Sequence, residues 1–227
     1  MYISIGDGVK VSAIDLTKIY DKISSTIDRE TITLSDTRRK VRSQMVLFIN
    51  ACVRKRSRTL RLAKQLLDML DGEIKEVKLE TIEFPVVDEK FINRRDELKN
   101  AGHYDDPIFM FAKDFANADT IVIAAPYYDL SFPAMLKQYF EQINVLGITF
   151  TYSDMGIPEG LCKAKSLYYV TTAGGPVISD HFGFGYVKAL AKTFYGIEEI
   201  YQIKAEGLDI IGADVESILK GASIESC

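Results

Sequence analysis

The stretch TIVIAAPYYDLSFPAMLKQYFEQI, residues 120–143, contains a strand, a loop and a helix in immediate succession. Residues 120–125 are almost all apolar and rich in β-branched side chains, as in a strand that is buried on both faces. Pro133 suits the first turn of a helix, where the N–H that it lacks would be unpaired anyway. The residues after it place apolar side chains at helical spacing: Met135, Leu136, Tyr139, Phe140 and Ile143. This stretch therefore predicts one strand-and-helix unit of a parallel sheet.

The same alternation recurs on both sides of this stretch. Strands are predicted at 45–50, 73–79, 166–172 and 197–203, and helices at 57–71, 109–118, 184–195 and 214–221. Five strands that alternate with helices predict a parallel sheet covered on both faces, and right-handed crossovers leave few ways to connect them. The predicted fold class is therefore α/β, a flavodoxin-like three-layer sandwich with a five-stranded sheet of order 2-1-3-4-5. Residues 80–107 are predicted to be irregular, and residues 150–161 to form a hairpin or lid.

The start of the predicted sheet divides the chain. Residues 45–227 are predicted to form the sheet domain, and residues 1–44 an N-terminal appendage. Within the appendage, two short strands in residues 1–12 are predicted to pair across a glycine-containing turn, followed by a weak helix from Asp15. The sequence of the appendage indicates no particular role.

Composition and charge argue against several classes of partner. The net charge of −4 disfavours nucleic acid, because phosphate backbones attract basic faces. No apolar run approaches the roughly 20 residues of a membrane-spanning helix, so no membrane partner is expected. The first residues lack the basic start and apolar centre of a secretory signal, which favours a cytoplasmic location. Three cysteines without C-x-x-C spacing and two distant histidines predict reduced thiols and no metal site.

The loop after the first predicted strand suits a phosphate group. Ligands of open parallel sheets bind outside the carboxyl ends of the strands, where the strand order reverses. Residues 50–59 of this loop read NACVRKRSRT, with the hydroxyl groups of Ser57 and Thr59 at a predicted helix start. A helix start offers free backbone N–H groups and the positive end of the helix dipole. The alternative is that Ser57 only caps the helix and that the basic residues form a solvated face. Cys52 is interpreted as a packing residue rather than a nucleophile.

The loops after the third and fourth strands suit a planar ring. Tyr127 and Tyr128 can give a ring an apolar wall, while Asp129 and backbone amides can meet its polar edge. The next loop contains Gly174 and Gly175, and glycines let a backbone approach a ligand closely. Each loop also has a purely structural interpretation, as a surface turn. All three loops are expected at the same edge of the sheet, which favours a ligand that contains both a phosphate and a planar ring.

Three groups of motifs resemble a known family. They are PYYDLS followed by LKQYF at 126–131 and 136–140, GITFTY leading to PEGL at 147–152 and 158–161, and TTAGG at 171–175. With these motifs, the chain from about Met45 to Ala222 resembles the FMN-dependent NADH:azoreductase and NAD(P)H:quinone oxidoreductase family of the flavodoxin-like superfamily. The resemblance implies FMN as the cofactor and NADH or NADPH as the co-substrate.

The resemblance also implies which residues hold FMN. The first loop would bind the phosphate, the loop after the third strand would lie against the isoalloxazine ring, and the Gly-Gly loop would close around the other edge of the ring. The implied cofactor-binding residues are Ala51, Ser57, Arg58, Thr59, Pro126, Tyr127, Tyr128, Asp129, Leu130, Thr172, Ala173, Gly174 and Gly175. The segment 147–161 resembles a hairpin that borders the active site in a homodimer, so a homodimer is expected.

Two pairs of residues depart from the family's pattern. Asp129-Leu130 stands where Asn-Phe is common, and Thr172-Ala173 stands where Ser-Arg is common. A carboxylate at position 129 would disfavour an anionic reduced flavin, so FMN binding is expected while the reduction of azo compounds stays open. No catalytic side chain is implied, because the flavin carries the chemistry.

Three functions are open at this point. The first is an oxidoreductase that passes electrons from NAD(P)H through FMN to a small acceptor in a ping-pong scheme, the acceptor being a quinone, an azo or a nitro compound. The second is a flavodoxin-type electron carrier, which has no nicotinamide site. The third is a flavin-free regulatory module on the same fold.

Overall fold

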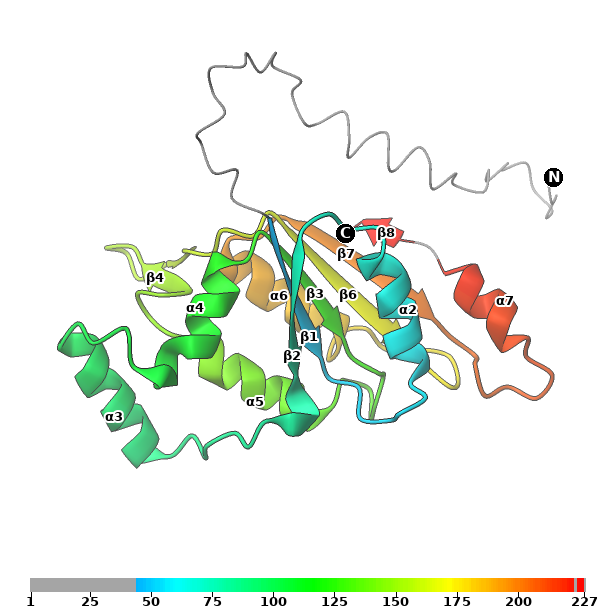
Figure 1. The fold of residues 1–227 in the computed structure, drawn as a ribbon, viewed down its shortest axis with the longest axis horizontal. Coiled ribbons are helices and arrows are strands. Elements are labelled where there is room, and N and C mark those ends of the chain that lie inside the picture. The colour runs from blue at the N-terminus through cyan, green and yellow to red at the C-terminus, as the bar shows by residue number, and fades with distance from the viewer. Residues whose placement is uncertain (1–43, 223, 227) are drawn as a thin grey trace, which may run out of the picture. The chain divides into compact units, whose positions relative to one another are not determined.

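The computed structural model describes residues 44–222 and 224–226 (Figure 1). The short strands and the helix predicted within the N-terminal appendage lie outside the described residues. Among the helices of the described part, none is long and apolar enough to span a bilayer.

A six-stranded sheet forms the centre of the fold (Figure 1). Five of its strands are parallel, and their order, β2-β1-β3-β6-β7, is the predicted 2-1-3-4-5. These strands are β1 (Met45–Asn50), β2 (Glu73–Lys78), β3 (Thr120–Ala124), β6 (Ser166–Thr172) and β7 (Glu199–Ala205). A further strand that the sequence analysis did not predict, β8 (Ile224–Ser226), pairs antiparallel with β7. The predicted α/β class and the order of the parallel strands are confirmed.

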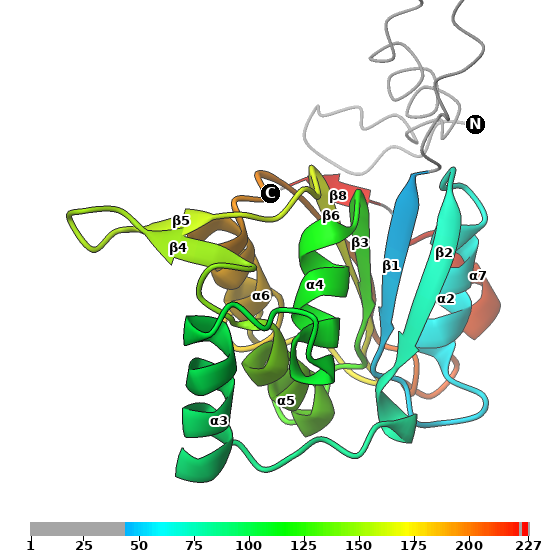
Figure 2. The same cartoon turned by 60° about the vertical axis from the view of Figure 1, so that its left-hand side comes forward.

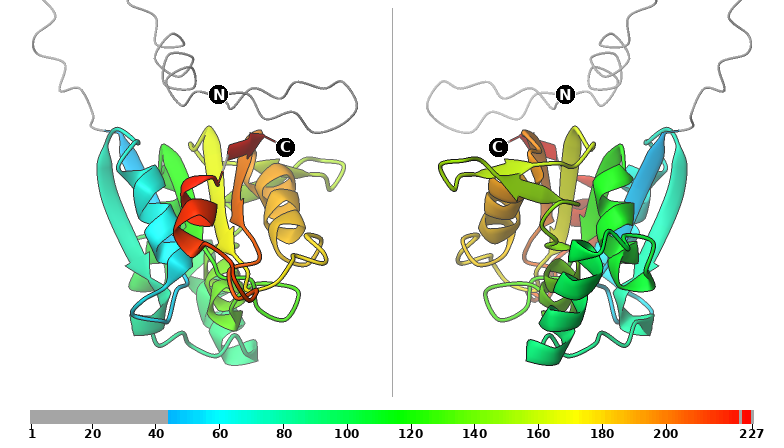
Figure 3. Two further views of the ribbon diagram at one scale, coloured as in Figure 1. Left: turned by 90° about the vertical axis from the view of Figure 1, so that its right-hand side faces the viewer. Right: turned by 90° about the vertical axis from the view of Figure 1, so that its left-hand side faces the viewer.

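Helices cover both faces of the sheet (Figure 3). One face carries α2 (Arg58–Leu67) and α7 (Val215–Lys220), and the other carries α4 (Met110–Asn117), α5 (Ala134–Ile143) and α6 (Phe184–Leu190), which continues as a π-helical turn over Ala191–Tyr195. Strand β1 contributes to both cores, since Leu47 packs into one and Phe48 into the other. This double burial is the reason that the strand is apolar throughout.

Strand β2 forms one outer edge of the sheet (Figure 2). Its sequence, EIKEVK, mixes charged with apolar residues, unlike the apolar run of a strand that is buried on both faces. Only Val77 of this strand is buried. Lys75 Nζ lies 2.6 Å from Asp114 Oδ2 in α4, and Asn50 Nδ2 donates to Glu76 Oε1 at 2.7 Å. Lys75 and Glu76 of this edge are therefore paired with the elements beside it.

The prediction that residues 80–107 are irregular is wrong for their middle part. Helix α3 spans Glu89–Asn100, between short 3-10 turns at Leu79–Thr81 and Pro107–Phe109. It begins after Asp88, whose carboxylate accepts the N–H of Phe91 at 2.8 Å. Of its twelve residues only Leu98 is buried, so the helix lacks the apolar stripe from which helices are recognised in sequence.

Smaller differences concern the boundaries of elements. Strand β7 begins at Glu199 rather than at 197, because Gly196, with φ of 70°, ends the π-helical turn and Ile197 packs into the core behind it. Helix α2 ends at Leu67, earlier than the predicted 71. The predicted hairpin is confirmed, because β4 (Phe150–Tyr152) pairs antiparallel with β5 (Pro158–Gly160), and it projects from the side of the sheet in Figure 2.

Candidate functional site

The three loops singled out in the sequence meet around one cavity at the carboxyl end of the parallel strands. Its volume is about 230 Å³. The predicted site residues that line it are Ser57, Arg58, Thr59, Pro126, Tyr127, Tyr128, Thr172, Ala173 and Gly174. Arg54, Arg56, Leu208 and Asp209 line it as well and were not among the predicted residues. The fold therefore brings most of the predicted site together and adds a fourth loop, which follows β7.

Four predicted residues lie outside the lining of this cavity. Ala51 is fully buried at the end of β1, where its N–H donates to the carbonyl of Ala124 at 2.9 Å. Asp129 and Leu130 form the tip of a tight turn, and Gly175 has open space where a side chain would begin. Their roles toward a cofactor stay predictions.

The turn at Asp129 and Leu130 has an unusual backbone. Both residues have positive φ, 49° and 67°, although neither is glycine. The flanking residues Tyr128 and Ser131 exchange two backbone hydrogen bonds of 3.0 and 2.7 Å, which closes the turn. Positive φ at both central positions is the geometry of a type I′ turn, and aspartate tolerates it better than leucine does. The turn holds Tyr128 at the rim of the cavity.

The start of helix α2 provides free backbone donors at the cavity. Ser57 caps the helix, because its hydroxyl oxygen accepts the N–H of Leu60 at 3.1 Å. The N–H groups of Arg58 and Thr59 donate to no acceptor within the described part of the chain. The capping interpretation of Ser57 is thus correct, and the same cap leaves two amides at the positive end of the helix dipole free for an anion.

Thr59 and Thr172 join α2 to the end of β6. Their hydroxyl oxygens lie 2.7 Å apart, and both side chains are buried. One hydroxyl donates to the other, so the pair fixes the start of α2 relative to the Gly-Gly loop. A buried hydroxyl that loses its partner is destabilising by about 1–3 kcal/mol.

Replacing Thr59 with valine should lower the free energy of unfolding of the flavin-free protein by about 2 kcal/mol, because the buried hydroxyl of Thr172 loses its hydrogen-bond partner. The double variant Thr59→Val/Thr172→Val should be less destabilised than the sum of the two single variants, since neither hydroxyl is then left alone. Urea denaturation of the four proteins measures this difference. Strictly additive losses would show that the two hydroxyl groups do not depend on each other.

The Gly-Gly loop is held by the loop after β7, residues 206–213, called the β7 loop below. The carbonyl groups of Ala173, Gly174 and Gly175 accept backbone N–H groups from this loop at 3.2, 2.8 and 3.1 Å. The N–H groups of Gly174 and Gly175 donate to no acceptor within the described residues. A Cβ added at Gly174 would lie 2.2 Å from Asp209 Oδ2. A side chain at 174 would therefore require the carboxylate of Asp209 to move.

Positive charge gathers where the loop between β1 and α2 lines the cavity. Arg58 donates to the carbonyl of Leu208 at 2.7 Å and to Asp209 Oδ1 at 2.5 Å. Arg54 and Arg56 also line the cavity, and neither has an ion-pair partner among the described residues. Two unpaired guanidinium groups therefore stand beside the free amides of the helix start.

The thiol nearest this loop has no features of a nucleophile. Cys52 is buried, and burial raises its pKa to about 11. Its Sγ lies 3.8 Å from the carbonyl oxygen of Ala124. At neutral pH the group is a neutral thiol, as its interpretation as a packing residue requires. Within the described residues no cluster of acidic, histidine or cysteine side chains is suited to a metal ion.

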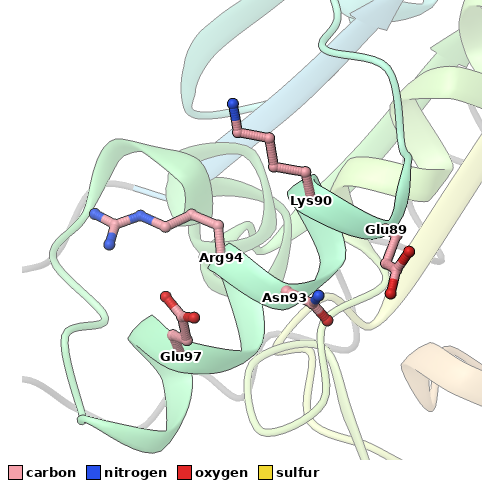
Figure 4. A pocket seen from close by; sticks show the side chains of 5 residues that line it. All are labelled: Glu89, Lys90, Asn93, Arg94 and Glu97. Carbon is pink, nitrogen blue, oxygen red and sulfur yellow. The ribbon is translucent and has the colours of Figure 1, made fainter.

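A second hollow lies on helix α3 (Figure 4). Its volume is about 460 Å³, and its lining residues all come from this one helix: Glu89, Lys90, Asn93, Arg94 and Glu97. Figure 4 shows that their charged side chains splay away from the helix without enclosing a space between them. The hollow lacks the convergent polar groups and the second wall of a ligand site, so the cavity at the strand ends is the candidate site.

Comparison with known proteins agrees with this geometry. The sequence profile of a family described by its flavodoxin-like fold matches residues 44–225. The chain belongs to this flavodoxin-like family. The match includes the whole of the parallel sheet and each of the four loops around the cavity, and it confirms the predicted fold class.

Curated relatives extend over most of this flavodoxin-like chain. An FMN-dependent NADH:quinone oxidoreductase of Coprothermobacter proteolyticus is 34% identical over 193 residues, which cover 80% of this chain and 95% of the relative. A protein of the same name from Clostridium beijerinckii is 33% identical over 186 residues, covering 78% and 93%. The resemblance seen in the sequence motifs is confirmed by these relatives.

Solved structures share the fold. An azoreductase from Bacillus anthracis has a TM-score of 0.66 and 23% identity, and covers 78% of this chain and 93% of its own. An FMN-dependent NADH-azoreductase from the same species, solved in complex with FMN, has a TM-score of 0.65 and 21% identity with the same coverage. At this level of identity the likeness shows the common fold.

Proposed function

We propose that this chain is an FMN-dependent oxidoreductase that passes electrons from NADH or NADPH to a small acceptor such as a quinone, an azo or a nitro compound. The observation that carries the proposal is the cavity at the strand ends, which has anion donors at one side and free amides with tyrosines at the other. The names of the curated relatives, which state FMN, NADH and quinone for those proteins, support the same activity here.

The phosphate of FMN fits the start of α2. The free N–H groups of Arg58 and Thr59, the hydroxyl of Ser57 and the unpaired side chains of Arg54 and Arg56 all line one side of the cavity. Amides at a helix start and guanidinium groups are the donors that proteins use for phosphate. These residues would hold the phosphate, as the resemblance implied for Ser57, Arg58 and Thr59.

The isoalloxazine ring fits the opposite side. Tyr127 is fixed there, because its hydroxyl donates to the carbonyl of Ser179 at 3.3 Å and accepts the N–H of Ser179 at 3.4 Å. Ser131 Oγ donates to the carbonyl of Phe182 at 2.6 Å, which ties the neighbouring turn to the same segment. The free amides of Gly174 and Gly175 would donate to the polar edge of the ring.

Bound FMN would supply the redox chemistry, hydride acceptance from the nicotinamide and two-electron transfer to the acceptor. The residues of the chain would bind and orient the cofactor: Arg54 and Arg56 would neutralise the phosphate, Tyr127 and Tyr128 would form a wall, and the amides of Gly174 and Gly175 would hold the edge of the ring. The resemblance puts Asp129 beside the ring, where its carboxylate would disfavour negative charge on the reduced ring. The reaction requires no nucleophile from the chain.

The organisation of the whole protein is part of the proposal. Residues 45–227 form the FMN-binding domain, and residues 1–44 are an appendage. The hairpin β4–β5 exposes Tyr152, Met155 and Ile157, whose apolar side chains are suited to a second copy in a homodimer. The free thiols of Cys52 and Cys162 suit a reducing compartment such as the cytoplasm.

An absorbance spectrum tests the proposal. The purified protein, mixed with FMN and desalted, should retain the flavin absorbance band and lose it within seconds when NADH or NADPH is added without oxygen. Reoxidation by a quinone or an azo dye then identifies the acceptor. A band that persists in the presence of nicotinamide would indicate an electron carrier, and a protein that retains no FMN would indicate a flavin-free module.

A further inference from the structure

The three arginines that line the cavity differ in what they contact. Arg58 reaches across to the β7 loop, where it binds Leu208 O and Asp209 Oδ1 at 2.7 and 2.5 Å. Arg54 and Arg56, on the same loop, have no such partner within the described residues. A positive charge that is already paired contributes little to the attraction of a phosphate, so the three guanidinium groups have different tasks.

We propose that the Arg58–Asp209 ion pair is a strap that positions the Gly-Gly loop, so that the guanidinium group of Arg58 acts on the ring end of the flavin site, while only the backbone N–H of Arg58 faces the phosphate. The inference rests on the proposed binding of FMN in this cavity. Asp209 is the link, because its N–H donates to Gly174 O at 2.8 Å and its Oδ2 lies directly over Gly174, 2.2 Å from the position of an added Cβ. A displaced Asp209 would therefore displace Gly174 and the two free amides beside it.

The strap works through geometry more than through charge. The side chain of Asp209 is 66% exposed and that of Arg58 is 28% exposed, and solvent screens an ion pair of this kind. Its strength lies in the two parallel donors of Arg58, which bind adjacent residues of the β7 loop and add to the three backbone hydrogen bonds between that loop and the Gly-Gly loop. Asp209 is thus a positioning residue.

The chain contains a matched control. Arg61, one turn further along α2, forms a bidentate ion pair with Glu216 of α7 at 2.7 and 3.0 Å. This pair also joins α2 to an element that follows β7, but neither residue lines the cavity. Asp209→Ala and Glu216→Ala therefore remove the same kind of partner from two arginines of the same helix.

Titration of the flavin-free protein with FMN and with riboflavin, which lacks the phosphate, tests the strap. Quenching of flavin fluorescence gives both dissociation constants. Asp209→Ala should raise the dissociation constants for FMN and riboflavin by the same factor, about fivefold. Glu216→Ala should leave both dissociation constants unchanged. Arg58→Gln/Asp209→Ala should bind no more weakly than Asp209→Ala alone, because the pair acts as a unit. A change confined to FMN, in either direction, would assign Arg58 to the phosphate and overturn the proposal.

Hydrogen exchange tests the strap without any flavin. In the flavin-free protein, the N–H groups of Gly207, Leu208 and Asp209, which donate to the Gly-Gly loop, should exchange their hydrogens several-fold faster in Asp209→Ala than in the wild type, and at the wild-type rate in Glu216→Ala. Unchanged exchange in Asp209→Ala would contradict the strap even if flavin binding changes. If the wild type binds neither flavin, the proposed function fails, and the exchange rates still decide whether Asp209 positions Gly174.

Discussion

Replacing both Arg54 and Arg56 with glutamine should raise the dissociation constant of the flavin-free protein for FMN about a hundredfold. The two guanidinium groups are unpaired and line the cavity beside the free amides of the α2 start, where the phosphate is proposed to bind. A hydrogen bond from a charged donor contributes about 1.5–3 kcal/mol, and the exposure of these side chains places each near the lower value, or about tenfold per arginine. The dissociation constant for riboflavin should stay nearly the same.

A charge-matched variant distinguishes contact from long-range attraction. Lys55→Gln/Lys64→Gln also removes two positive charges from the same loop and helix, but neither lysine lines the cavity. It should weaken FMN binding no more than about twofold at physiological salt, because salt screens exposed charges that make no direct contact with the phosphate. If the two double variants weakened FMN binding equally, the arginines would act only through the general electrostatic field of the basic stretch. If the arginine variant weakened FMN and riboflavin binding equally, the arginines would not contact the phosphate.

Replacing Gly160 with alanine should destabilise the protein by about 3 kcal/mol, because the hairpin and the π-helical turn are in backbone contact at this residue. A Cβ at 160 would lie 2.1 Å from the N of Gly196 and 2.2 Å from the carbonyl carbon of Tyr195. Neither atom belongs to a flexible side chain. Tyr195 is also fully packed, with its hydroxyl donating to Asn144 Oδ1 at 2.7 Å, so the turn cannot retreat without disturbing the core.

Gly156 provides the comparison within the same hairpin. Its φ is 74°, but no atom lies within 4 Å of the Cβ that alanine would add. Gly156→Ala should therefore cause only backbone strain, about 1 kcal/mol. Urea denaturation of both variants measures the two losses. If Gly160→Ala were no more destabilising than Gly156→Ala, the close approach between the hairpin and the π-helical turn would not exist in solution.

The sequence predicted the parts of the fold that are buried on both faces. Strands β1 and β3 are apolar throughout because each packs into two cores, and this pattern predicted the strands. The alternation of five strands with helices then predicted the flavodoxin-like order of the sheet. The order in turn predicted that Ser57, Tyr127 and Thr172 would meet, although they are far apart in the chain. A rule about strand ends thus located a cavity that no single motif identified.

The parts that escaped prediction lack such a pattern. Helix α3 is polar on almost all sides, and the three residues of β8 are too few to show a period. Leu208 and Asp209 were missed although they follow a predicted strand, because the β7 loop has no glycine pair or aromatic cluster to draw notice. Applied to every parallel strand, the same rule about strand ends would have included them.

The two outer edges of the sheet have consequences for how the protein behaves at high concentration. Residues 201–203 of β7 pair with β8 on their outer side, whereas no strand among the described residues pairs with the outer side of β2. Another chain that added a strand to β2 would have to lie beside the charged side chains of Glu73, Lys75 and Lys78. Charged side chains on an outer strand discourage stacking of sheets into fibres. Apolar replacements of these charged residues should therefore make the β2 edge prone to aggregation.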